Sequence, residues 1–134
     1  MRIIGGIYKG RRVKFPNSKL VRPTTDRIKE SLFNYFNNFI DFEGANVLDI
    51  YAGSGSLGLE ALSRGAAEVH FVEKNFKIYK VLQENTGSLD ETGNCKVFKA
   101  DAVSFSRNKP KIKYDLILAD PPFYKYDIHQ VVEN

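Results

Sequence analysis

The sequence has few of the residues that build disulfide frameworks and metal clusters. Its 134 residues include a single cysteine, Cys95, and two histidines, which excludes an internal disulfide and a zinc cluster. No apolar run approaches the roughly 18 residues that a membrane helix needs, and residues 1–6 lack the apolar core of a signal peptide. We therefore expect a cytoplasmic, monomeric protein without a metal ion and without a membrane segment.

Positive charge is concentrated at the start of the chain. The whole chain carries +4, but residues 1–30 hold nine basic and two acidic residues, a net +7, so the remainder carries −3. A basic segment on a slightly acidic body indicates binding to a polyanion, although a solvated hairpin gives the same pattern. Glycines between two short strands, at 2–4 and 11–15, predict a hairpin. We divide the chain into a basic N-terminal hairpin arm, residues 1–20, and a second domain, residues 21–134.

A helix is predicted to follow the arm, with Thr25 as its N-cap. Helical spacing places one set of apolar residues on a single face, and we expect most of its aromatic rings to lie in the core. These residues are Ile28, Leu32, Tyr35, Phe36 and Phe39.

From residue 45 onward, short apolar runs alternate with helical segments. The runs at 47–50, 69–72, 96–100 and 116–119 predict strands, and the segments at 57–64, 76–85 and after Asp101 predict helices. This alternation indicates an α/β fold with a mostly parallel sheet and flanking helices. Such sheets bind ligands at the carboxyl ends of their strands, which makes the residues after each strand informative.

A glycine-rich loop follows the first of these strands. Gly53, Gly55 and Gly58 satisfy the GxGxxG pattern, in which glycines allow a tight turn and a close approach of the backbone to a ligand. The pattern alone also fits a nicotinamide dinucleotide or a turn without a ligand. Asp49, however, precedes Gly53 by four residues, and a carboxylate there can meet a cationic amino-acid group. S-adenosylmethionine has such a group and NAD lacks one.

Acidic residues also end the next two strands. Glu73 follows Asp49 by 24 residues, a spacing typical of a carboxylate that accepts hydrogen bonds from ribose hydroxyls. Asp101 and Ala102 follow the third strand, where they can meet an adenine amino group. A surface glutamate and a helix cap are the simpler interpretations of each residue alone, but acids at three consecutive strand ends favour a cofactor site.

The fourth strand runs into the most specific motif of the sequence, Asp-Pro-Pro-Phe-Tyr at 120–124. Two prolines cannot donate hydrogen bonds and hold their carbonyls as rigid acceptors. Asp120 supplies another acceptor beside Pro121, and Phe123 offers a flat face for stacking. Together they predict a receptor for a planar ring with an exocyclic amine, unless the motif is only a proline-stiffened loop.

The motifs at 22–26 (Arg-Pro-Thr-Thr-Asp), 49–66, 73, 101–102 and 120–123 resemble, in order and spacing, those of bacterial 16S ribosomal RNA guanine-N2 methyltransferases. The resemblance covers essentially the whole chain. It implies a Rossmann-like class I fold, S-adenosylmethionine as cofactor, and ribosomal RNA, within a small-subunit particle, as partner. Family members continue with further strands, so we expect this chain to be C-terminally incomplete.

The candidate residues fall into three groups. We expect catalysis from Asp120, Pro121 and Phe123, and cofactor binding from Asp49, Gly53, Gly55, Glu73, Asp101 and Ala102. Substrate contacts are expected from Arg11, Arg12, Lys14, Arg22, Arg27 and Tyr124. Three alternatives stay open: methylation of adenine N6 in DNA or RNA, a nicotinamide-dependent oxidoreductase, and a non-catalytic RNA-binding module.

Overall fold

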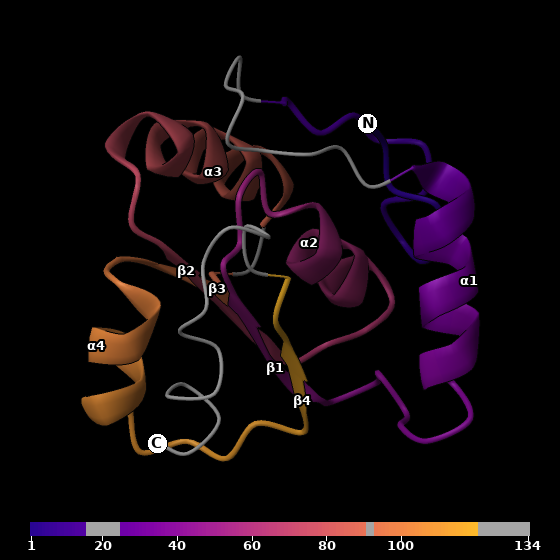
Figure 1. The fold of residues 1–134 in the computed structure, drawn as a ribbon. Helices are drawn as coiled ribbons and strands as arrows, with labels where there is room; N and C mark the ends of the chain where they lie inside the picture. Colours follow the sequence, from indigo (N-terminus) through magenta and orange to yellow (C-terminus); the bar gives the residue numbers. More distant parts are fainter. Residues whose placement is uncertain (16–24, 91–92, 121–134) are drawn as a thin grey trace.

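A parallel sheet forms the centre of the computed structural model, which describes residues 1–15, 25–90 and 93–120 (Figure 1). Among these residues the sheet has four strands in the order β3-β2-β1-β4. The strands are β1 (Asn46–Ile50), β2 (Glu68–Glu73), β3 (Cys95–Lys99) and β4 (Leu116–Leu118), and the helices are α1 (Asp26–Phe36), α2 (Ser56–Ser63), α3 (Phe76–Leu89) and α4 (Ala102–Arg107). The predicted α/β fold with a parallel sheet is confirmed.

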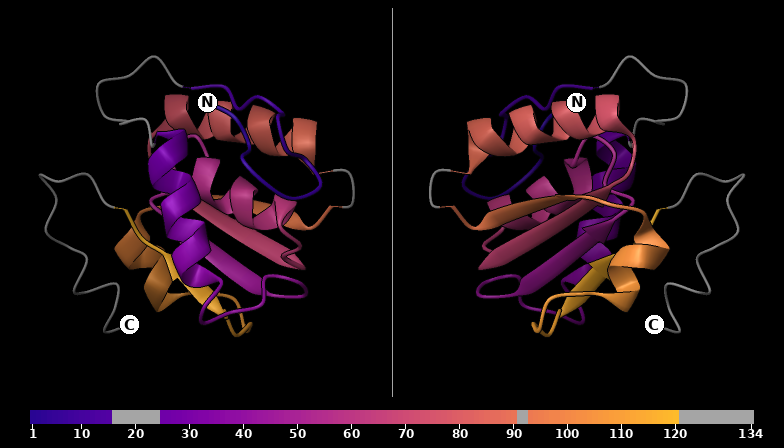
Figure 2. Two further views of the ribbon diagram at one scale, coloured as in Figure 1. Left: turned by 90° about the vertical axis from the view of Figure 1, so that its right-hand side faces the viewer. Right: turned by 90° about the vertical axis from the view of Figure 1, so that its left-hand side faces the viewer.

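The inner strands are apolar on both faces because helices cover both sides of the sheet. Figure 2 shows α2 and α3 on one face and α4 on the other. Alternate residues of β1 therefore enter two cores: Val47 packs with Leu59 of α2 and Leu82 of α3, whereas Leu48 packs with Phe105 of α4. This burial on both faces is typical of parallel strands and explains the mostly apolar runs at 47–50 and 69–72, which contain one polar residue each, Asp49 and His70.

Side-chain caps fix the starts of three helices. Thr25 accepts a hydrogen bond from the Ile28 amide at 3.2 Å, which confirms its predicted role at α1, and Asn75 caps α3 in the same way. Asp101 caps α4. Among the described residues, no helix has both the length and the apolar character needed to span a membrane.

The N-terminal residues form an antiparallel pair, although a shorter one than predicted. Arg2 and Arg12 form a single bridge, and the Ile3 amide donates to the Arg11 carbonyl at 2.9 Å. Ile3 and Val13 are 1% and 3% exposed and belong to the main core, so this segment is packed onto the helices. The predicted boundary at residue 20 lies outside the described residues.

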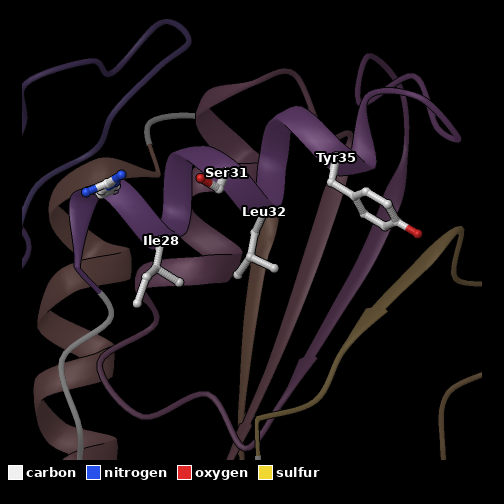
Figure 3. A pocket seen from close by; sticks show the side chains of 5 residues that line it. Ile28, Ser31, Leu32 and Tyr35 are labelled. Carbon is white, nitrogen blue, oxygen red and sulfur yellow. The ribbon is translucent and has the colours of Figure 1, made fainter.

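The prediction for the buried face of α1 is wrong. The helix buries Phe33 and Lys29, while Phe36 is only partly buried. The other four residues of the predicted face are exposed, with exposed fractions of 54% (Ile28), 36% (Leu32), 60% (Tyr35) and 73% (Phe39). Three of them, Ile28, Leu32 and Tyr35, line a shallow groove of about 310 Å³ together with Arg27 and Ser31 (Figure 3).

Two glycines of the helices provide a matched test of this packing. A Cβ at Gly58 would lie 2.3 Å from Cε1 of Phe71, whereas a Cβ at Gly87, within α3, would meet nothing within 4 Å. We predict that Gly58→Ala lowers the free energy of unfolding by about 1–3 kcal/mol through overpacking. Gly87→Ala should raise it by about 0.5–1 kcal/mol, because alanine loses less entropy in a helix. Urea denaturation of both variants tests this, and equal effects would contradict the packing described here.

Candidate functional site

The glycine loop after β1 has an unusual backbone. Gly53 and Gly55 have φ angles of 58° and 86°, in the left-handed region that glycine tolerates. Tyr51 also has a positive φ, 81°, where a side chain is strained. The Val72 carbonyl of β2 accepts hydrogen bonds from the amides of Tyr51 and Ala52, which holds the loop over the end of the sheet. Gly53 and Gly55, the two glycines expected to bind the cofactor, therefore occupy backbone conformations that favour glycine.

Asp49 lies buried beneath this loop. Its side chain points to α2, where Oδ2 accepts a hydrogen bond from the Gly58 amide at 3.0 Å, and the residue is 3% exposed. Burial, with smaller contributions from the nearby carboxylates of Asp120 and Glu73, raises the pKa of Asp49 to about 8 against the opposing hydrogen bond from the Gly58 amide. A cation bound here would favour the ionised form. The site thus suits a positively charged ligand.

Glu73 at the end of β2 is tied to the same loop. Its Oε1 accepts from the Gly53 amide at 3.0 Å, and its Oε2 accepts from the Asn75 amide at 2.9 Å. Each carboxylate oxygen can accept a second hydrogen bond, so the group still has capacity for ligand hydroxyls. The side chain is held in place by backbone donors before any ligand arrives.

Asp101 and Asp120 extend this edge of the sheet on either side. Glu73 pairs with Lys99 of β3, and Asp101 follows two residues later as the exposed cap of α4, with Oδ2 accepting from the Ser104 amide at 3.2 Å. Ala102 is 5% exposed and begins α4. Asp120 is exposed and follows β4 by two residues. The acids predicted from four strand ends therefore lie along one edge.

The predicted substrate contacts are not all alike. Arg11 donates from Nη2 to the Ser88 carbonyl at 2.8 Å, and Lys14 forms an exposed ion pair with Glu84 at 2.8 Å. Arg12 is exposed, and among the described residues its side chain shows no hydrogen bond or ion pair. Arg27 lines the groove on α1. Arg22, Pro121, Phe123 and Tyr124 lie outside the described residues.

Sequence reasoning missed a buried ionic cluster behind the glycine loop. Glu60 of α2 is 0% exposed, and its carboxylate accepts from the amides of Ile4 and Gly5 at 2.9 and 3.0 Å and from Nε of Arg64 at 2.8 Å. Nζ of Lys29 lies 3.3 Å from the same carboxylate. Desolvation lowers the pKa of Lys29, and the charge of Glu60 opposes that shift. A charged residue among the apolar residues of α2 was the available signal.

Lys29 and Asn85 link this cluster and α3 to the loop. Nζ of Lys29 donates to Oγ of Ser56, the first residue of α2, at 3.1 Å, and to the Arg2 carbonyl at 2.6 Å. Asn85, 2% exposed, donates to the Ser54 carbonyl at 2.8 Å. Its position in the apolar stripe of α3 was the signal that could have revealed it.

The fold and this edge define a class. A parallel sheet ordered β3-β2-β1-β4, with a glycine loop after β1 and carboxylates at the neighbouring strand ends, is the core of the class I methyltransferase fold. All 134 residues match the family described as "Conserved hypothetical protein 95", and the chain belongs to that family.

Two relatives from different organisms share one name. Over 123 residues the chain is 42% identical to "Ribosomal RNA small subunit methyltransferase D" of Escherichia coli K12, covering 92% of this chain and 60% of that protein. It is 38% identical over 128 residues to the protein of that name from Haemophilus influenzae, covering 92% and 64%. The chain thus spans about three fifths of the length of these relatives.

Solved structures show the same fold. The yhhF protein of Escherichia coli superposes with a TM-score of 0.84 at 36% identity, over 99% of this chain and 70% of that one. A hypothetical protein from Thermus thermophilus gives a TM-score of 0.86 at 27% identity, over 99% of this chain and 77% of that one.

Within the described residues of the present chain, no three His, Cys, Asp or Glu side chains are grouped to hold a metal ion.

The raised pKa of Asp49 predicts a characteristic pH dependence of stability. Its pKa is about 8 in the folded chain and about 4 in the unfolded chain, so the folded chain holds an extra proton between these values. Its contribution to stability is therefore complete below pH 4 and is lost as the pH rises to about 8. We predict that the free energy of unfolding of Asp49→Asn, relative to wild type, rises over this window by up to about 1.4 kcal/mol per pH unit.

Denaturant titrations from pH 4 to 9 provide the measurement. Asp41→Asn is the control, because Asp41 is exposed and, within the part of the chain that the structure describes, its carboxylate accepts from the Glu43 amide alone. Its curve should run parallel to that of the wild type. A parallel curve for Asp49→Asn as well would contradict the buried, protonated state described here.

Proposed function

We propose that this chain binds S-adenosylmethionine and transfers its methyl group to the N2 amine of a guanine in small-subunit ribosomal RNA. The observation that carries the proposal is the convergence of Asp49, Glu73 and Asp120 at the end of the sheet, beneath and beside the glycine loop. The names of the relatives support ribosomal RNA as substrate. The choice of guanine N2 over adenine N6 rests on the resemblance of the sequence motifs.

The residues present fit this cofactor. Asp49 is a buried carboxylate whose pKa shift a cationic amino-acid group would reverse, and the glycines keep the loop free of side chains at its turn. Glu73 has remaining acceptor capacity for ribose hydroxyls, and Asp101 with Ala102 stands beside it for the adenine. When bound, the cofactor supplies an electrophilic methyl group on a sulfonium.

Asp120 is assigned the central role in catalysis. The guanine amine is a poor nucleophile because its lone pair is delocalised into the ring. Hydrogen bonds from its two protons to the Asp120 carboxylate and the Pro121 carbonyl favour a more pyramidal nitrogen and free the lone pair. The carboxylate would also stabilise the positive charge that develops on that nitrogen as the methyl–sulfur bond breaks. The methylated amine would then lose its surplus proton to solvent, and S-adenosylhomocysteine would leave. Holding the reacting atoms in line supplies most of the acceleration, an effect that can reach about 7–11 kcal/mol.

The base must leave its helix or stack to reach Asp120. We assign stacking on the base to Phe123, with Tyr124 beside it, and phosphate contacts to the basic residues of the N-terminal segment and the start of α1. Arg12 is the foremost of these, because Arg11 and Lys14 already bond to α3. Arg22 and Arg27 complete the set.

Replacing Asp120 tests the catalytic assignment. We predict that Asp120→Ala binds S-adenosylmethionine within about twofold of wild type but transfers methyl groups at least about a hundredfold more slowly, a loss typical of removing one preorganised electrostatic partner. Asp115→Ala is the matched control, since Asp115 precedes the opposite end of β4 and its carboxylate bonds to the Asn46 amide. Filter binding and single-turnover transfer to small-subunit RNA give both quantities. An unchanged rate for Asp120→Ala would refute its role.

Salt dependence tests the phosphate contact. Arg12→Ala should weaken RNA binding and reduce the slope of log K against log salt concentration by about one. Lys111→Ala removes the same charge from an exposed residue in the segment that precedes the amino end of β4. It should leave the slope unchanged. Fluorescence anisotropy across a salt series gives the slopes, and equal slopes for Arg12→Ala and wild type would exclude the contact.

A further inference from the structure

One buried side chain joins the basic N-terminal segment to the glycine loop. The Oδ1 atom of Asn85 accepts from the Lys14 amide at 2.8 Å, and its Nδ2 donates to the Lys14 carbonyl at 2.9 Å and to the Ser54 carbonyl at 2.8 Å. Ser54 lies between Gly53 and Gly55. The side-chain amide of Asn85 thus bonds at the same time to Lys14, two residues after Arg12, and to the centre of the loop.

The chemistry of these contacts makes them specific to asparagine. The side chain uses one acceptor site and both donors, so a flipped amide would place its NH₂ against the Lys14 amide. Asn85 is 2% exposed, so water does not compete for these bonds. An aspartate has the same shape and keeps the acceptor, but it offers no donor to the two carbonyls.

A second set of contacts holds the start of the same segment to α2. The Glu60 carboxylate accepts from the Ile4 and Gly5 amides, and Oγ of Ser63 accepts from the Tyr8 amide at 2.9 Å. With its start fixed to α2 and its end fixed through Asn85, the segment has little freedom to shift unless Asn85 shifts too. Displacements of Ser54 and of Lys14 are therefore linked.

We propose that Asn85 is a positioning residue that couples the two binding surfaces, so that a ligand on the glycine loop raises the affinity of the basic segment for RNA. The inference rests on the proposed function. A ligand that fixes the Ser54 carbonyl also fixes the Asn85 amide and hence the backbone of Lys14. By linkage, RNA must raise the affinity for the loop ligand by the same factor.

The coupling is measured as the ratio of two affinities for a ligand of the glycine loop, one with RNA and one without. Calorimetry gives the affinity of S-adenosylhomocysteine, which allows no turnover, with and without small-subunit ribosomal RNA. In wild type we expect RNA to tighten its binding about fivefold or more, the lower end of typical couplings. In Asn85→Asp the ratio should fall to about one. A residue with a merely structural role would lower both affinities and leave their ratio unchanged.

Gln83→Ala is the control, because Gln83 lies exposed on the same helix and its side chain donates to the Tyr79 hydroxyl of the same helix, away from Lys14 and Ser54. It should keep the wild-type ratio. A ratio of one in wild type, or a wild-type ratio in Asn85→Asp, would overturn the inference. Failure of RNA or S-adenosylhomocysteine to bind wild type at all would instead refute the proposed function.

A measurement on the unmodified chain covers the case in which Asn85→Asp does not fold. Adding S-adenosylhomocysteine should slow hydrogen exchange at the Lys14 amide several-fold, because that amide donates its hydrogen bond to Oδ1 of Asn85. The Asp115 amide donates a hydrogen bond to the carbonyl of Asn46, the first residue of β1, at the amino ends of the strands. It should exchange at an unchanged rate. Equal effects at the two amides, or no effect at either, would contradict the coupling.

Discussion

The arrangement of this chain depends on one buried carboxylate, that of Glu60. It accepts from two backbone amides of the N-terminal segment and from Arg64, and it lies beside the ammonium of Lys29, all with no exposure of its own side chain. Removing one member of such a buried set costs about 3–5 kcal/mol, because a charge is then left without a partner. The cluster fixes α1, α2 and the N-terminal segment against each other, and α2 begins where the glycine loop ends.

That fixed frame allows the edge of the sheet to carry unfavourable features. The loop has a strained Tyr51, and two carboxylates, those of Asp120 and Glu73, lie close enough to raise the pKa of the buried Asp49. Strain and like charges both cost stability in the free protein, and a cationic ligand would offset the repulsion between the like charges. The exposed apolar stripe of α1 is a different kind of feature, because no described residue covers it.

The sequence predicted the sheet and the site edge well, for physical reasons. Strands buried on both faces leave short, mostly apolar runs, and the predicted run at 47–50 differs from β1 by one residue. The carboxyl ends of parallel strands share an edge, which brought Asp49 and Glu73, at the ends of β1 and β2, together with Asp120, which follows β4. Helical periodicity, however, finds an apolar stripe on α1 without saying what it faces, and the helix buries Lys29 and Phe33 instead. Apart from Arg64, four residues from Glu60, the partners of Glu60 and Asn85 described above come from distant segments, so no local pattern indicated them.

The most direct test of the account is to identify the product. Small-subunit ribosomal RNA lacking the modification is incubated with the protein and S-adenosylmethionine labelled in its methyl group, then digested to nucleosides and analysed by mass spectrometry. We predict label in N2-methylguanosine at a single position. Label in N6-methyladenosine would show that the amine receptor serves another base, and an absence of label in RNA, with cofactor bound, would contradict the assignment of ribosomal RNA as substrate.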